Sequence, residues 1–175
     1  MTRKAIDSER LVAFLAGFAL FLATIEYAIP KPLPFLRLGI ANLPILIALR
    51  RLPLKDLLVL VGIKLLVQGF YSGTLFSYIF VLSACGGIAS GAIMVLAALL
   101  PPGKVSLAGC SLLGAFASNA VQLAVAGFFI FGQGVFVIAP PFLLLGTISS
   151  FLLGFFAEQF VQKSAWVSKH LPLKN

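Results

Sequence analysis

The stretch IPKPLPFLRLGIANLPILIAL, residues 29–49, interrupts a chain that is otherwise almost purely apolar. It places four prolines, two basic residues and Asn42 between long apolar runs. The prolines at 30, 32 and 34 remove backbone donors and prevent helix formation, so they predict a stiff extended loop over 30–37. A helix is expected to restart at about Leu38, with Pro44 still near its beginning, where proline is tolerated.

The composition is too apolar for a soluble domain. The 175 residues are 61% hydrophobic and 10% charged, and the mean hydropathy is +1.10. A soluble domain of this size has too much surface for its volume to hide so many apolar side chains. We therefore expect an integral membrane protein in which lipid is the solvent for most of the chain.

Six transmembrane helices are predicted from the apolar runs between breakers. Each must be a helix because lipid cannot satisfy open backbone polar groups. The chain is expected to form one transmembrane domain, 1–175, without a cleaved signal peptide. The predicted helices are about 11–29, 38–50, 54–71, 75–100, 105–131 and 135–162.

The distribution of Lys and Arg predicts the orientation of these helices. Six crossings place both termini on one side, and that side would carry ten of the 13 basic residues. The other side would carry only Lys31 and Arg37, with Lys64 inside a helix. This bias predicts cytoplasmic termini and an outer position for the 30–37 loop. Since the charges gather at helix ends and not along one stripe, nucleic acid is not an expected partner.

Polar residues within the predicted helices need a reason, because burying them in lipid is costly. Six of them fall in the outer half of the membrane: Glu26, Asn42, Lys64, Gln68, Asn119 and Gln122. Their shared depth predicts an outward-facing substrate pocket, capped by the 30–37 loop with Arg37. Lys64 and Arg37 would favour a ligand with an anionic or acceptor-rich part. The alternative is a structural network, such as a Glu26–Lys64 ion pair.

Small residues at four-residue spacing let helix backbones approach closely. Such spacing occurs at Gly87 and Gly91, and again at Gly146, Ser150 and Gly154. We expect these residues to pack helices within one bundle, although a face between subunits is also compatible with the pattern.

No motif for catalysis is evident in the sequence. It contains no phosphate-binding Walker A loop, no nucleophile–base pair and no Asp-rich pair to hold Mg²⁺ on a diphosphate. Cys85 and Cys110 lack metal-ligand spacing and are interpreted as core residues. Neither an enzyme nor a bound metal or cofactor is therefore expected.

Residues 30–69, PKPLPFLRLGIANLPILIALRRLPLKDLLVLVGIKLLVQG, carry a family resemblance. The Pro-rich loop, the basic residue before Leu-Gly-Ile-Ala-Asn, the short apolar helix and the amphipathic restart resemble the bacterial family called heptaprenyl diphosphate synthase component I, or Gx transporter family. This sequence has Phe35-Leu36-Arg37 where the pattern has a Gly-containing turn. That family in turn resembles the substrate-binding S components of energy-coupling-factor (ECF) uptake transporters.

The resemblance implies a six-helix protein of the bacterial cytoplasmic membrane with a lid loop over its pocket. It implies docking through an Ala-xxx-Ala face of the first helix, here Ala19 and Ala23, onto a transmembrane T component driven by two ATPase subunits. The pocket would then be lined by loop 30–37, Asn42, Lys64 and Gln68.

Two alternatives to this transport function stay open, as does the substrate. The chain is also compatible with a non-catalytic partner of a polyprenyl diphosphate synthase, or with a structural, assembly or channel protein. Lysine and arginine together with 17 phenylalanines for stacking would suit a flavin or similar aromatic anion. An isoprenoid or quinone precursor is the other small-molecule substrate considered.

Overall fold

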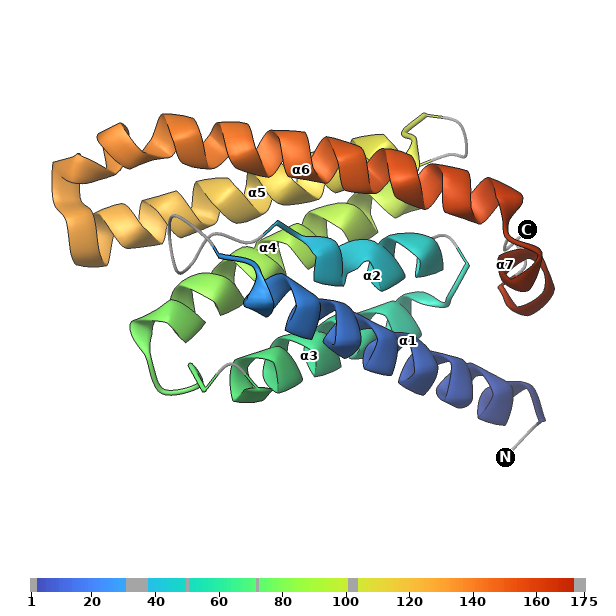
Figure 1. The fold of residues 1–175 in the computed structure, drawn as a ribbon. Coiled ribbons are helices and arrows are strands. Elements are labelled where there is room, and N and C mark those ends of the chain that lie inside the picture. The colour runs from blue at the N-terminus through green and yellow to red at the C-terminus, as the bar shows by residue number, and fades with distance from the viewer. Residues whose placement is uncertain (1–2, 31–37, 50, 72, 101–103, 172–175) are drawn as a thin grey trace.

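The chain folds into long helices around one short buried helix (Figure 1). The computed structural model describes residues 3–30, 38–49, 51–71, 73–100 and 104–171. Over these residues it contains helices and turns without a strand. The elements are α1 (Arg3–Ala28), η1 (Ile40–Asn42), α2 (Leu43–Ala48), α3 (Leu54–Tyr71), α4 (Tyr78–Leu99), α5 (Leu107–Ala126), η2 (Gly127–Phe131), η3 (Gly132–Gly134), α6 (Val135–Lys163) and α7 (Ala165–His170).

Three helical stretches of the described chain are long and apolar enough to cross a membrane. They are Glu9–Ala28, Tyr78–Ala97 and Leu107–Lys163, and the last comprises both α5 and α6. α5 and α6 run antiparallel, side by side, and meet at a tip that projects beyond the other helices (Figure 1). The chain is thus all-helical with membrane-spanning helices, as the composition predicts.

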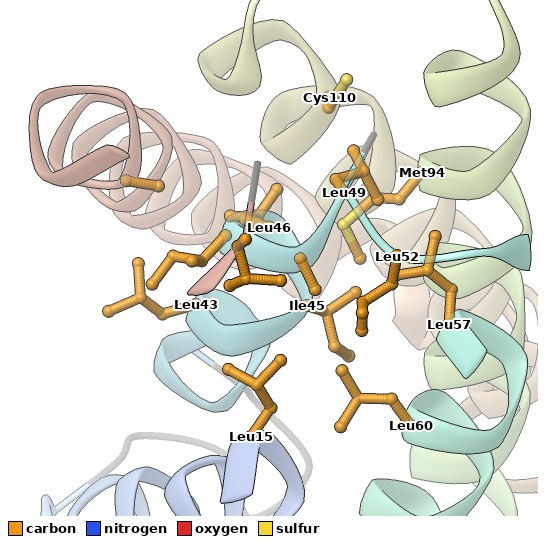
Figure 2. Close-up of a cluster of buried hydrophobic side chains, with 14 of the residues drawn as sticks. Leu15, Leu43, Ile45, Leu46, Leu49, Leu52, Leu57, Leu60, Met94 and Cys110 are labelled. Atoms are coloured by element: carbon orange, nitrogen blue, oxygen red, sulfur yellow. The ribbon is translucent and has the colours of Figure 1, made fainter. Parts of the chain in front are cut away.

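The second predicted helix, 38–50, is shorter than expected. It comprises a 3₁₀ turn, η1, and the six-residue α2, whose residues Leu43–Ala48 are all buried. Figure 2 shows α2 at the centre of an apolar cluster, with Leu15 of α1, Leu57 and Leu60 of α3, and Met94 of α4 around it. Six helical residues rise only about 9 Å, so α2 alone is too short to span a bilayer. Its buried side chains contact protein.

The predicted small-residue faces pack helices within the chain. A Cβ on Gly91 of α4 would meet Val61 of α3 at 2.9 Å, and one on Gly154 of α6 would meet the Ala108 Cα of α5 at 2.5 Å. The hydroxyl of Ser111 donates to the Ser150 carbonyl at 2.8 Å, which links α5 to α6. These faces are therefore intramolecular.

The first and last helices meet at one end of the molecule. The start of α1 and all of α7 lie at the same end, opposite the α5–α6 tip (Figure 1). The rings of Phe14 and Trp166 lie 5.3 Å apart, and Val167 and Leu171 are buried in the same apolar cluster as α2. α7 is not predicted from the sequence.

Candidate functional site

The Leu-Gly-Ile-Ala-Asn motif forms one wall of a polar site. The Glu26 carboxylate, at the end of α1, accepts three backbone N–H groups from the start of this motif. Oε1 accepts from Leu38 at 2.8 Å and from Gly39 at 3.3 Å, and Oε2 accepts from Ala41 at 3.3 Å. Only 2% of Glu26 is exposed. The three backbone N–H groups satisfy both oxygens of this buried carboxylate, and the carboxylate fixes the motif against α1.

Gly39 has a structural requirement for glycine. Its φ is +83°, in the left-handed region, where a Cβ is unfavourable. From the other side, the Ser149 hydroxyl of α6 donates to the Leu38 carbonyl at 2.5 Å. The motif is thus held between α1 and α6 and turns Asn42 toward α3.

Lys64 and Asn42 meet across this wall. The Lys64 ammonium donates to Asn42 Oδ1 at 2.7 Å, and Lys64 is buried in α3. The sequence allowed either a ligand contact or a pair with Glu26 for this lysine. In the structure Asn42 is one partner of Lys64, and three backbone N–H groups are partners of Glu26.

A cavity of about 40 Å³ lies between these residues and helices α4, α5 and α6. A volume of this kind holds roughly three water molecules. Five of the predicted binding residues line it: Glu26, Asn42, Lys64, Gln68 and Asn119. Residues far apart in the sequence thus form one enclosed polar site.

Two buried polar atoms in the cavity wall lack a hydrogen-bond partner among the described residues. They are Oε1 of Gln68, which is 9% exposed, and Oγ of Ser90, which is 3% exposed. A buried acceptor left unsatisfied is costly, so each such group calls for an explanation. Both atoms are available to a ligand in the cavity.

Sequence reasoning missed the serines of the wall. These hydroxyls extend the polar lining along α4, α5 and α6, and Ser111 lies only in the second turn of α5, near the end where the termini lie (Figure 1). Serine is common in apolar helices, so a single serine gives no signal. The serines in the lining are Ser83, Ser90, Ser111, Ser118 and Ser150.

The prediction of aromatic stacking is not supported by this site. Among the described residues that line the cavity there is no aromatic side chain. Many phenylalanines instead lie on the outer surface, for example Phe128, which is 83% exposed, and Phe136. In a membrane helix an outward phenylalanine contacts lipid, which explains their abundance without a ligand.

Gln122 lies outside the described cavity wall, contrary to its predicted role. It is buried between α5 and α4, where its Nε2 donates to the Ser118 hydroxyl at 2.9 Å and contacts the position that a Cβ of Gly86 would occupy. It sits one turn beyond Ser118 on the face of α5 that meets α4, so its amide fills an interhelical space. Arg37 and all of the predicted lid over 30–37 except Pro30 lie outside the described residues.

Ala19 and Ala23, the predicted docking residues, are buried within the chain itself. Their exposed fractions are 0% and 5%. They lie on the same side of α1 as Glu26, which faces α2 and α3. The exposed side of α1 instead carries Gly17, with open space around its Cα, and Phe21.

Fold and site together define an all-helical protein with membrane-spanning helices around an enclosed polar cavity. The family of heptaprenyl diphosphate synthase component I has a model that matches residues 15–160, and the chain belongs to this family. The family predicted from residues 30–69 is thereby confirmed. Comparison with curated proteins and with solved structures gave no match.

Proposed function

We propose that this chain is the substrate-binding S component of an ECF-type uptake transporter in the bacterial cytoplasmic membrane. The observation that carries the proposal is the enclosed polar cavity with Lys64, Gln68 and Ser90 in its wall. A buried polar cavity costs stability, and such groups in membrane helices are the usual marks of a substrate site. The proposal includes six crossings with cytoplasmic termini, as the charge bias predicts.

The proposed activity is binding and not catalysis. Glu26 is the one carboxylate in the described cavity wall, and three backbone N–H groups occupy its oxygens. It is therefore engaged in holding the Leu-Gly-Ile-Ala-Asn motif. Energy for uptake would come from two ATPase subunits, coupled through a transmembrane T component.

The partner contact on α1 can be tested with a matched pair of glycine variants. If the T component docks on the exposed side of α1, Gly17→Leu would place a bulky side chain in the interface. Gly62→Leu is the control, since Gly62 of α3 also has open space around it. We expect Gly17→Leu to reduce co-purification of the T component at least about tenfold while Gly62→Leu leaves it unchanged.

The main experiment is purification of the tagged chain from its native membrane. We expect a T component and an ATPase pair to co-purify. Recovery of the chain without them, under conditions that preserve other membrane complexes, would contradict the proposal.

A second function is favoured by the family description, which names a component of heptaprenyl diphosphate synthase. In that case the chain would be a non-catalytic membrane partner of a polyprenyl diphosphate synthase. Prenyltransferase activity measured with and without this chain separates the two functions. An activity that requires the chain would favour the synthase and count against transport.

A further inference from the structure

We infer that the end of α6 carries a binding site for one anionic phospholipid, with its phosphate at Lys163 and an acyl chain along Phe156 and Phe160. The site is a shallow groove at the end of α6 that leads into α7 (Figure 1). None of its described lining residues also lines the polar cavity, so the inference holds for either of the two functions considered above. The described lining residues are Phe156, Gln159, Phe160, Lys163 and Ser164.

The first four of these side chains lie on one face of α6, because they follow the helical spacing i, i+3, i+4 and i+7. The rings of Phe156 and Phe160 are exposed, lie 6.5 Å apart and are nearly parallel, at 17°. Lys163 follows in the last turn of the helix. The groove is therefore apolar at the end nearer the middle of α6 and polar at the end nearer α7.

The polar end offers hydrogen-bond donors to a phosphate group. Lys163 contributes an ammonium and Gln159 an amide NH₂ group. The Ser164 hydroxyl accepts from the Val167 N–H at 3.3 Å, and its own proton can be donated to a phosphate oxygen. The described lining contains no carboxylate, and Glu158, five residues before Lys163, lies about 140° away from it around the helix. The charge at this end therefore favours an anion.

The apolar face continues beyond the groove toward the middle of α6, where Leu152 and Ile148 are exposed. From Lys163 to Leu152 the helix rises about 17 Å, close to half of the roughly 30 Å of hydrocarbon in a bilayer. This length fits an acyl chain whose headgroup lies at Lys163. Trp166, near the start of α7, is partly exposed at the same end, and tryptophan is enriched at the level of lipid headgroups.

Trp166 allows a direct test, because it is the only tryptophan of the chain and follows Ser164 by two residues. Bromine atoms on an acyl chain quench tryptophan fluorescence on contact. The full chain is reconstituted into phosphatidylcholine vesicles with increasing amounts of brominated phosphatidylglycerol, which is anionic, or of brominated phosphatidylcholine, which has no net charge. We expect half-maximal quenching at a mole fraction of the anionic lipid at least about fivefold lower, since one lysine near the surface contributes about that factor.

The chain offers a matched control for each end of the site. Lys163 and Lys169 are both exposed and each lies three residues from Trp166, but only Lys163 lines the groove. Lys163→Gln should reduce the preference for the anionic lipid to less than about twofold, and Lys169→Gln should leave it near its original value. Phe155 and Phe156 are 55% and 57% exposed, and only Phe156 lines the groove. Phe156→Ala should raise the mole fraction of brominated phosphatidylglycerol for half-maximal quenching at least about threefold, whereas Phe155→Ala should not.

Three results would overturn the inference. Equal quenching by the two lipids would show that Lys163 serves only as a topology signal and a partner of the helix dipole. Equal effects of Lys163→Gln and Lys169→Gln would show diffuse attraction to a basic surface instead of a site. Relief of the quenching by millimolar glycerol 3-phosphate, which has no acyl chain, would assign the groove to a soluble phosphate. If Lys163→Gln fails to fold, the Phe156→Ala and Phe155→Ala pair decides the same question.

Discussion

Glu26 is the residue on which the site depends most, because its carboxylate is the anchor for the backbone at Leu38, Gly39 and Ala41. Glu26→Gln removes the charge and replaces one carboxylate oxygen with an NH₂ group. That group is a donor and cannot accept the backbone N–H groups that the oxygen accepts. We expect it to destabilise the protein by about 1–3 kcal/mol, the usual cost of unsatisfied buried donors. Thermal unfolding in detergent measures this loss.

The matched control for Glu26 is Glu158 of α6, which is only partly buried. Glu158→Gln should change the melting temperature little, since a partly exposed carboxylate has water as an alternative partner. Equal destabilisation by the two substitutions would show that the backbone contacts of Glu26 contribute nothing specific.

The sequence identifies most of the polar wall, because apolar helices make each polar residue conspicuous. Glu26, Asn42, Lys64, Gln68 and Asn119 were all predicted from their depth, and all line the cavity. The depth of a polar residue along a helix can be read from the sequence, whereas the direction in which its side chain points around the helix axis cannot. Gln122 therefore fell outside the described wall, although its depth was similar to that of Asn119.

The α5–α6 pair is the element most sensitive to added volume. A Cβ on Gly154 would lie 2.5 Å from the Ala108 Cα, and backbone cannot move aside as a side chain can. Gly154→Ala should therefore destabilise the protein by about 1–3 kcal/mol through overpacking, despite the better helix propensity of alanine. Chemical denaturation in mild detergent gives the change in free energy of unfolding.

Gly17→Ala is the control for this effect, since it makes the same substitution in α1 with nothing within 4 Å of the new Cβ. It should be neutral or stabilising by up to about 1 kcal/mol, from helix propensity alone. If Gly17→Ala is as harmful as Gly154→Ala, close packing is not the cause.

α7 is held in place by Arg51, in the turn between α2 and α3. The Arg51 Nη1 donates to the Leu171 carbonyl, and Val167 and Leu171 are buried beside α2. Burial lowers the pKa of Arg51 from its usual value, but a guanidinium starts so high that it stays charged from about pH 5 to 9. The contact should therefore be insensitive to pH over this range.

Arg51→Met should loosen α7 at a cost of about 1–3 kcal/mol, the usual value for a hydrogen bond from a charged donor. The loosening of α7 is measured as faster amide hydrogen exchange over residues 165–171. Lys55→Met removes an exposed charge nearby and should leave this exchange rate unchanged.

Helix lengths explain which elements the sequence could predict. Long apolar runs between Pro and Gly predict both ends of α3, α4 and α6 to within three residues. α1 begins eight residues before its predicted start, and α5 ends five residues before its predicted end. α7 is only six residues long and lies in a polar tail, where the local pattern is weak. The length of α2 could not be read from its apolar run, because hydropathy does not distinguish burial in protein from burial in lipid.

At the scale of the whole molecule, the long α5–α6 pair relates the fold to the membrane. α6 has 29 residues and so extends about 44 Å, more than the roughly 30 Å of hydrocarbon in a bilayer. Its tip lies at the opposite end from α7 and the start of α1 (Figure 1). The start of α1, the turn before α3 and the end of α6 lie at the end with α7, and they carry Arg10, Arg51 and Lys163 (Figure 1). These basic residues predict that the tip faces outward.

This orientation can be tested by labelling single cysteines in intact cells. Cys85 and Cys110 are replaced by alanine, and a cysteine is introduced at Gln133 of the tip or at Lys169 of α7, both of which are exposed. A membrane-impermeant maleimide should label Gln133→Cys in intact cells and Lys169→Cys only after lysis. The reverse pattern would invert the topology and place the wall formed by Glu26 and Gln68 toward the cytoplasm. In that orientation the cavity could not capture a solute from outside, so the labelling result also decides whether uptake is physically possible.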